Sequence, residues 1–527
     1  MSTLTRCAAV LALLTAMTAC SGPPLESAPA RTLSDTPPQL VPAMALPDNA
    51  VASAVARLDG IAGELMASSG IPGMAVAVVH GGKTLYAKGF GVRDTRTADK
   101  VDADTVFQLA SLSKPIAATV VAHEVGTRTV SWDTPIVDEL PWFALSDPAA
   151  TGMLTVADLF AHRSGLPDHA GDLLEDLGYD RRDVLQRLRL LPLDQFRTSY
   201  AYTNFGVTAA ADAVSAAAGA RWEDLSERVL YRPLEMDSTS SRFSDYQARP
   251  DRAVGHVRVP PGPAGSYQPL YTRNADAQSP AGGVSSSVID LTRWLAMMLA
   301  DGSYDGNQIV DPAALLSAVT PQIVSSPPTQ PAMRSGFYGY GFNVGTSAAG
   351  RVHFSHSGAF SLGAGTNLVI IPSADVAIVA LTNAAPSGVP ETLTAEFADL
   401  VEFGEVREDW RKLYAGAFAG MARPFGDLAG KAAPANPAPP RPLASYAGVY
   451  ANDYWGAATV ADKGGKLTVS LGPRPEVYEL SHWDGEVFTF GLASENAPAG
   501  SVSKATFDGD RLTLEYFDAD KMGTFLR

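Results

Sequence analysis

The stretch FQLASLSKPIAATVV, residues 107–121, places a serine and a lysine three positions apart at the beginning of an apolar run. Pro115 is tolerated only near the start of a helix, so we expect Ser111 at or just before the first helical turn. Residues three apart share one helix face, which brings the Lys114 amine within reach of the Ser111 hydroxyl. Backbone N–H groups and the helix dipole favour negative charge there. A lysine amine that is shielded from water beside the hydroxyl would have a lowered pKa and could accept the proton of the hydroxyl.

The same stretch therefore predicts a nucleophilic serine that needs no histidine base, but Ser-x-x-Lys also arises by chance in long chains.

At 527 residues the chain is too long for one compact core, and two or three domains are expected. The formal net charge of −16 argues against nucleic-acid binding, which needs a basic face. The sequence contains no G-x-x-x-x-G-K-[ST] phosphate loop, no G-x-S-x-G elbow and no H-E-x-x-H motif.

The amino terminus is predicted to be a targeting segment. An apolar stretch, residues 7–19, is too short to span a bilayer but fits a signal peptide. It ends at MTAC, which resembles the cleavage site of bacterial lipoproteins. We therefore expect a lipoprotein-type signal peptide over residues 1–20 and lipidation of Cys20. Cleavage after Ala30 is the alternative.

Both cysteines of the chain, Cys7 and Cys20, lie in or at the edge of this segment. The mature fold is therefore predicted to contain no disulfide and no thiol nucleophile. We expect an exported, periplasmic protein that is held to a membrane only by its lipid anchor. The outer membrane is favoured where the host has one.

Proline-rich stretches divide the rest of the chain. Residues 21–50 contain seven prolines and are predicted to be a disordered tether, and 426–442 is predicted to be a stiff linker. Between them, 51–425 has mixed α/β character. The last part, 443–527, consists of short alternating runs separated by Gly-Gly, Asp-Gly and Gly-Pro turns, which predicts a small antiparallel barrel or sandwich with few catalytic candidates.

Several elements of the larger part can be predicted from periodicity. Residues 74–92 are expected to form a strand hairpin. Helices are expected over 154–163 and 286–300, where apolar residues recur at helical spacing. Late in this part, 366–372 and 375–383 are expected to be adjacent buried strands.

Two further patterns carry candidate chemistry. Tyr202 and Asn204 are two apart on a looped or extended segment, so they can point the same way, and a phenol near a lysine ammonium can relay protons. Alone, such a pair is more often a packed core aromatic and a turn residue. The second pattern, 356–359, is His-Ser-Gly-Ala at a predicted hairpin, where small residues allow a substrate backbone to approach. His353 lies three positions before His356, on the opposite face of a strand, so a shared metal ion is not expected.

Taken together and in this order, Ser-x-x-Lys, Tyr-x-Asn and His-x-Gly resemble the penicillin-recognising serine hydrolases, in particular the group of class C β-lactamases, D-Ala-D-Ala carboxypeptidases, D-aminopeptidases and related esterases. The likeness covers about residues 50 to 400. The stretches that support it are 101–115, 154–167, 279–295 and 338–345. The C-terminal part resembles the lipocalin-like β domains appended to some members.

The resemblance implies an α/β (α+β) fold of the β-lactamase/transpeptidase type: an antiparallel sheet flanked by helices, an all-helical region, and a small antiparallel β-barrel after them. It also implies catalytic roles. Ser111 would be the nucleophile, and Lys114 and Tyr202 the proton-transfer network. Backbone N–H groups of Ser111 and Ala359 would form the oxyanion hole.

The remaining implied roles concern the substrate. Asn204, His356, Ser357 and Gly358 would bind it. No metal or organic cofactor is needed, and the partner would be a small-molecule or peptide substrate. The resemblance leaves the oligomeric state open.

One residue departs from the pattern of true β-lactamases and carboxypeptidases, which usually have lysine where this chain has His356. A histidine of ordinary pKa is mostly neutral at pH 7 and supplies no fixed charge for a substrate carboxylate. We therefore expect a serine hydrolase acting on esters or amides, including D-configured ones. The alternatives are a β-lactamase or D-Ala-D-Ala carboxypeptidase, and a non-catalytic ligand-binding module on the same fold. His162, in the turn HRSGLP, is expected to be scaffold.

Overall fold

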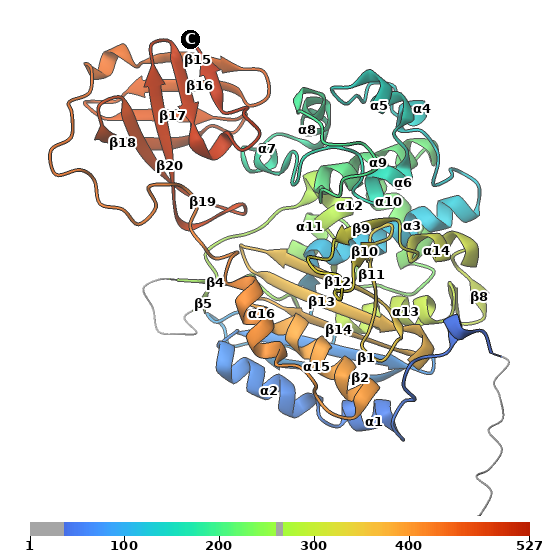
Figure 1. Cartoon of the computed structure of the whole chain (residues 1–527). Helices are drawn as coiled ribbons and strands as arrows, with labels where there is room; N and C mark the ends of the chain where they lie inside the picture. Colours follow the sequence, from blue (N-terminus) through green and yellow to red (C-terminus); the bar gives the residue numbers. More distant parts are fainter. Residues whose placement is uncertain (1–35, 260–266) are drawn as a thin grey trace, which may run out of the picture. The chain divides into compact units, whose positions relative to one another are not determined.

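An eight-stranded antiparallel sheet is the centre of the hydrolase-like part in the computed structural model of this protein, which describes residues 36–259 and 267–527 (Figure 1). The predicted signal peptide, 1–20, and Cys20 lie outside the described residues. In spatial order the strands are β2 (Lys83–Gly91), β1 (Gly73–His80), β14 (Val376–Thr382), β13 (Ala364–Ile371), β12 (Val352–Phe360), β11 (Asn343–Thr346), β10 (Gly336–Tyr338) and β9 (Ile323–Ser326).

The predicted hairpin and the predicted pair of late strands are both confirmed. β1 pairs antiparallel with β2, and β13 pairs antiparallel with β14. β14 lies between β13 and β1, so strands from the two ends of this part are neighbours in the sheet. Three short pairs lie outside it: β3 (Phe107–Gln108) with β6 (Ser285–Ser286), β4 (Val257–Arg258) with β5 (Tyr267–Gln268), and β7 (Ser303–Tyr304) with β8 (Asn307–Gln308).

Both faces of the sheet are covered, which explains the continuous apolar run of β1. Side chains of a strand alternate between faces, and Val76 packs into one core cluster while Ala77 packs into another. Figure 1 shows α1, α2, α15 and α16 along one face. Their bounds are α1 (Ala50–Val55), α2 (Leu58–Ser69), α15 (Val389–Phe403) and α16 (Trp410–Phe418). On the other face, α13 (Val288–Leu299) packs against β1, β2 and β14. The helix expected over 286–300 is thereby confirmed.

The remaining helices form the all-helical region that the resemblance implies. They are α3 (Ser113–Gly126), α4 (Ile136–Glu139), α5 (Pro148–Met153), α6 (Val156–Phe160), α7 (Asp172–Asp176), α8 (Arg181–Arg187), α9 (Asn204–Ala217), α10 (Trp222–Ser226), α11 (Phe243–Ala248), α12 (Ser279–Gly282) and α14 (Pro312–Ala318), with a π-helical turn at Glu227–Tyr231. α6, expected within 154–163, begins after Thr155, whose side chain forms a capping box with Asp158.

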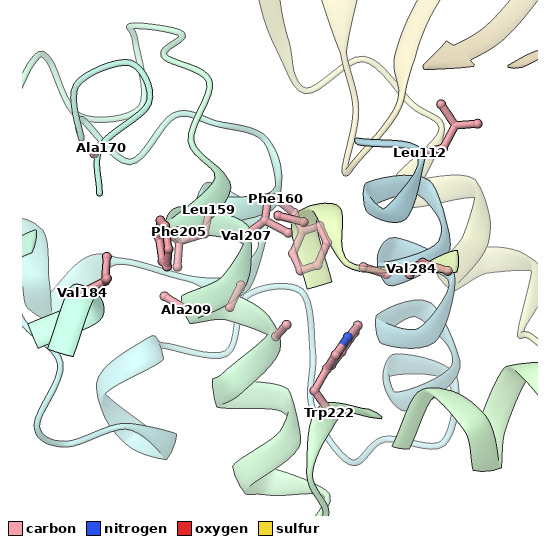
Figure 2. Close-up of a cluster of buried hydrophobic side chains, with 14 of the residues drawn as sticks. Leu112, Leu159, Phe160, Ala170, Val184, Phe205, Val207, Ala209, Trp222 and Val284 are labelled. Carbon is pink, nitrogen blue, oxygen red and sulfur yellow. The ribbon is translucent and has the colours of Figure 1, made fainter. Parts of the chain in front are cut away.

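The first residues of α9 are held by a fully buried apolar cluster. Figure 2 shows side chains of this cluster, among them Leu159 and Phe160 of α6 and Phe205 and Val207 of α9. Burial of a large side chain such as Phe205 contributes roughly 1.5–3 kcal/mol. Because Asn204 directly precedes Phe205, the packing of this cluster fixes where the Asn204 side chain emerges.

The C-terminal part is a closed eight-stranded antiparallel barrel, as predicted. Its strands are β15 (Gly448–Asn452), β16 (Gly456–Asp462), β17 (Leu467–Leu471), β18 (Glu476–Asp484), β19 (Val487–Ser494), β20 (Ala497–Asp508), β21 (Arg511–Leu514) and β22 (Thr524–Leu526). β15 pairs with β22 and closes the barrel. Aromatic rings gather inside it: the ring of Tyr446 lies 4.7 Å from that of Phe507 and 5.2 Å from that of Phe488.

The two proline-rich stretches are more ordered than their composition suggests. The expected tether ended at residue 50, but Arg351 already donates a hydrogen bond of 2.7 Å to the Met44 carbonyl, and Leu46 packs against the core. The linker follows the barrel: Gly485 donates to the Ala438 carbonyl at 2.9 Å. Proline fixes φ, and the residues between prolines still offer backbone groups that pair with a strand edge.

Over the described ranges, no helix combines the length and apolar character needed to cross a bilayer.

Candidate active site

Ser111 lies in a short 3-10 turn, Ala110–Leu112, that leads directly into α3, as the sequence predicts. Ala110, just before it, has a φ of +48°, a left-handed conformation that a residue with a Cβ adopts only when its surroundings force it. The neighbouring backbone supplies that constraint. Leu109 donates to the Val284 carbonyl at 2.9 Å, and its own carbonyl accepts from the Thr366 hydroxyl at 2.8 Å. The Ser111 hydroxyl is thus presented from a strained, firmly anchored turn.

Lys114 lies on the same helix face as Ser111 and is completely buried. Its Nζ makes three hydrogen bonds: 3.1 Å to Ser111 Oγ, 2.6 Å to Asn204 Oδ1 and 3.0 Å to the Ala281 carbonyl oxygen. The last two partners can only accept, so the amine donates to both. A neutral amine then has one lone pair left, and that lone pair faces the Ser111 hydroxyl.

Burial lowers the pKa of Lys114 to about 7, against a partial opposing effect of the Asp172 charge. Removal of an ammonium from water disfavours its charged form, and this loss outweighs the nearby carboxylate. A substantial fraction of Lys114 is therefore a neutral amine at neutral pH. Such an amine can accept the proton of the serine hydroxyl beside it.

Tyr202 lies against Lys114, with the amine 4.4 Å from the centre of its ring. Hydrogen bonds on both sides fix the loop that carries it: its N–H donates to Asp168 Oδ1 at 2.9 Å, and its carbonyl accepts from His169 N–H at 2.7 Å. Burial raises the pKa of Tyr202 well above its usual value, and a hydrogen bond with Ser111 offsets only part of this. Tyr202 is therefore a neutral phenol, and a proton donor, at neutral pH.

The His162 ring packs against the Tyr202 ring, as expected for a scaffold residue. The two ring centres are 4.5 Å apart, and the His162 ring is buried. The Thr203 N–H donates to Nδ1 at 3.1 Å, so the proton of the neutral ring is on Nε2. Burial lowers the pKa of His162 well below its usual value, and the nearby Lys114 charge adds to this.

Asn204 connects Lys114 to two residues that no sequence motif identified, Asp172 and His169. Asn204 Oδ1 accepts from Lys114, and its Nδ2 donates to Asp172 Oδ2 at 2.8 Å. His169 Nδ1 also hydrogen-bonds Asp172 Oδ2 at 2.8 Å. Burial alone would lower the pKa of His169, but the hydrogen bond and charge of Asp172 raise it. The other carboxylate oxygen, Asp172 Oδ1, is buried without a hydrogen-bond partner.

The end of β12 faces the Ser111 turn. β11 pairs only with residues 352–355 of β12, so 356–360 extend beyond it. A Cβ on Gly358 would lie 2.5 Å from the Leu109 carbonyl oxygen and 3.0 Å from the Ser111 nitrogen. Only glycine permits this approach, which brings the backbone of Ala359 beside that of Ser111. These are the two residues expected to supply oxyanion-hole donors.

His356 does not occupy the place expected for a substrate-binding residue. Its side chain is buried: Nδ1 donates to the Ser357 carbonyl at 2.7 Å, so Nε2 must accept from the Tyr338 hydroxyl at 2.8 Å. Burial, with the nearby Lys114 charge, lowers the pKa of His356 to about 3. The ring is therefore a neutral acceptor that holds β12 to β10. Ser357 does line the pocket, although its hydroxyl donates to Glu391.

A pocket of about 260 Å³ opens at Ser111 and gathers most of the predicted residues. The predicted residues that line it are Ser111, Tyr202, Asn204, Ser357 and Ala359. Arg273, Glu495 and Asn496 also line it and were not predicted. Glu495 and Asn496 belong to the barrel, where few catalytic candidates were expected. Among the described residues, no group of three or more His, Cys, Asp or Glu side chains is placed to hold a metal ion.

Two protein-family models match this chain. The beta-lactamase family model matches residues 58–403, and the model of a domain of unknown function, DUF3471, matches 432–518. The likeness of the C-terminal part to lipocalin-like domains stays a prediction.

Individual proteins show the same relationship. The chain is 28% identical over 423 residues to an unguisins hydrolase from Aspergillus violaceofuscus. This alignment covers 73% of each of the two chains. It is 29% identical over 397 residues to penicillin-binding protein 4 from Amycolatopsis lactamdurans, and this alignment covers 72% of this chain and 93% of that protein. The octameric penicillin-binding protein homologue from Pyrococcus abyssi has the same fold, with a TM-score of 0.58 at 18% identity over 90% of this chain and all of that one.

The contact between Asn204 and Asp172 makes the pKa of Lys114 testable. In Asp172→Asn the carboxylate charge that raises this pKa is gone, so the pKa is expected to fall below its present value of about 7. The titration of lysine Cε resonances by ¹³C NMR measures it, and the resonance absent from Lys114→Met identifies Lys114. An unchanged or higher pKa in Asp172→Asn would contradict the assigned electrostatics.

Proposed function

Because the chain belongs to the beta-lactamase family, whose members include serine hydrolases, we propose that it hydrolyses esters or amides through an acyl-enzyme on Ser111. The observation that carries the proposal is the contact between Ser111 Oγ and the Lys114 amine at 3.1 Å, in a site where burial lowers the pKa of that amine to about 7. Ser111 thereby has a base within hydrogen-bond distance.

In the proposed first step, the Ser111 oxygen attacks the substrate carbonyl and its proton passes to neutral Lys114. The carbonyl oxygen becomes an oxyanion, which accepts hydrogen bonds from the backbone N–H groups of Ser111 and Ala359. Each such donor typically contributes about 3 kcal/mol in the transition state. The N-terminus of α3 adds its positive dipole at the same place.

In the second step, the carbon–oxygen or carbon–nitrogen bond to the leaving group breaks, and the leaving group takes a proton from Tyr202. The phenol is suited to this role because its raised pKa keeps it protonated. The Lys114 ammonium restores that proton. A water molecule then attacks the acyl-enzyme with the same groups, and Ser111 and the product acid are released.

The surroundings of His356 support esters and amides over penicillins as substrates. A buried histidine with a pKa of about 3 offers no positive charge to a substrate carboxylate. Arg273, a permanent cation that lines the pocket, already donates to Glu175 at 2.6 Å. We therefore propose a small-molecule or peptide substrate without a required carboxylate at that place.

The decisive test compares p-nitrophenyl butyrate with nitrocefin, a chromogenic cephalosporin. We expect a higher kcat/KM for the ester, and a loss of at least about 10³-fold in kcat in Ser111→Ala because the nucleophile is gone. Mass spectrometry should detect an acyl adduct on Ser111. A higher kcat/KM for nitrocefin would favour the β-lactamase alternative, and turnover that survives in Ser111→Ala would overturn the proposal.

The rate of the proposed hydrolysis should increase with pH. The base must be neutral, so kcat/KM for p-nitrophenyl butyrate is expected to rise with pH through about 7 and then level off. Rates measured from roughly pH 5 to 9 give the midpoint, which should move to lower pH in Asp172→Asn. A flat profile would rule out Lys114 as the base.

We propose the following organisation for the whole chain: a lipoprotein-type signal peptide at 1–20, a tether from residue 21, a hydrolase domain ending near residue 425, and a linker, 426–442, that leads to the barrel, 443–527. Export would place the enzyme in the periplasm, attached through lipidated Cys20. In Cys20→Ser we expect the protein to move from the membrane fraction to the soluble one. Equal partition of the two forms would remove the lipid anchor from the proposal.

A further inference from the structure

Glu391, in the first turn of α15, is a buried carboxyl group that the proposed mechanism does not use. The residue is only 4% exposed, and its Oε1 accepts a hydrogen bond from the hydroxyl of Ser357, which lines the pocket. Its other oxygen, Oε2, is buried without a hydrogen-bond partner among the residues that the structure describes. Burial of such a group is costly. A carboxyl group kept at this cost, one hydrogen bond away from the pocket, points to a role in the reaction.

Hydrogen bonds fix the first turn of α15 to the sheet beside Ser357. Asn367 of β13 is paired directly with Ser357 of β12, and its Oδ1 accepts from the Thr394 hydroxyl of α15 at 2.8 Å. The same hydroxyl lies 3.1 Å from the Glu391 carbonyl oxygen. The position of the Glu391 carboxyl group is therefore set by the packing of α15 on the sheet.

The charged groups around Glu391 leave it close to its neutral form. Burial raises the pKa of Glu391 to about 7, and hydrogen bonds from the serine hydroxyl and from its own backbone N–H offset only part of this. Burial also raises the pKa of Tyr414 on α16, and the Glu391 charge adds to this. Arg411 of α16 donates instead to Glu396, at 2.8 Å, and to Glu64 of α2, at 2.9 Å. The other elements that pack on α15, namely α1, β13 and β14, carry no titratable side chain.

The ionisation of Glu391 decides what the Ser357 hydroxyl can offer to a substrate. Ionised Glu391 can only accept, so it takes the Ser357 proton and leaves the lone pairs of the serine oxygen for the pocket. Neutral Glu391 can itself donate to the Ser357 oxygen, which frees the serine proton. The first state suits a substrate N–H group, whereas the second suits a substrate oxygen atom.

The position of Ser357 indicates which part of the substrate it meets. Ser357 directly follows His356, whose ring centre is 6.4 Å from that of Tyr202, and Ser357 and Tyr202 line the same pocket. Tyr202 is the residue proposed to protonate the leaving group. Ser357 is therefore expected on the leaving-group side of Ser111.

We propose that Glu391 is a positioning residue that holds the Ser357 proton, so that the Ser357 oxygen accepts a hydrogen bond from an N–H group of the leaving group. This inference rests on the proposed function and narrows its substrate class. The ionised pair favours amides and peptides, whose leaving group carries an N–H, over esters with the same acyl part. Neutral Glu391 gives up this preference, because two donors then face each other.

The test compares two substrates that form the same acyl-enzyme, butyryl p-nitroanilide and p-nitrophenyl butyrate. Protonation of Lys114 affects both reactions alike, so it cancels in the ratio of kcat/KM, amide over ester. In the unmodified full chain this ratio is expected to rise about fivefold between about pH 5.5 and 8.5, since Glu391 ionises over this range and one hydrogen bond is gained.

Two variants and a matched control assign the rise. In Glu391→Gln the ratio should no longer depend on pH, because an amide does not ionise. In Ser357→Ala the acceptor is gone, so the ratio should stay at the low value that the unmodified protein has at acid pH. The control is Glu402→Gln, which should keep the rise. Glu402 is also a buried residue of α15 with a pKa raised by burial, but it accepts from Ser347, at 2.7 Å, in the turn between β11 and β12.

A ratio that does not change with pH in the unmodified protein would overturn the inference. A rise that persists in Glu391→Gln would also overturn it, and would assign the rise to another group of the pocket such as His169, whose pKa is raised. Should Glu391→Gln fail to fold, the unmodified protein and Ser357→Ala decide the same point.

Failure of the proposed function has a different signature, because the protein would then hydrolyse neither substrate. The dissociation constants of the two compounds, measured by calorimetry at the same two pH values, would still test the hydrogen bond. A shift of about fivefold towards the amide at the higher pH supports the inference, and an unchanged ratio of the constants overturns it.

Discussion

Removal of the Lys114 amine from water disfavours its protonated form, and the surrounding residues offset part of this desolvation cost with hydrogen bonds. The amine is completely buried, yet its hydrogen bonds to Asn204, the Ala281 carbonyl and Ser111 replace the lost hydration. Each partner comes from a different element: α9, α12 and the turn before α3. These elements must therefore be packed correctly before the amine has its place, and the apolar cluster around Phe205 provides that packing.

The electrostatics of the site shift the pKa values of the two proposed proton-transfer groups, Lys114 and Tyr202, in opposite directions. Burial lowers the pKa of an ammonium and raises that of a phenol, so the same water-excluded environment suits Lys114 to the proposed role of base and Tyr202 to that of acid. His162 and His356, the two nearby histidines, have lowered pKa values and remain neutral supports of Tyr202 and β12. Neither histidine is placed to exchange protons at neutral pH.

Much of the fold could be predicted from the sequence because its signals are local. The hairpin at 74–92, the helix start at Ser111 and the alternating runs of the barrel depend on residues close to one another in the chain. The contact between Ser111 and Lys114 follows from helix geometry alone. The burial of His356 could not be predicted in this way, since it depends on Tyr338 of β10. Arg273 and Glu495 were missed for the same reason, because neither belongs to a short motif and only the folded chain brings them to the pocket.

The β19–β20 turn also has a consequence for the order in which the enzyme matures. Domains generally fold as units, with the N-terminal part first during synthesis. Ser111 and Lys114 come far earlier in the sequence than the barrel residues that carry Glu495 to the pocket wall. A chain whose barrel has not folded would therefore hold Ser111 in a pocket that lacks this wall. The pocket around Ser111 is therefore complete only once the barrel strands that flank the β19–β20 turn have formed.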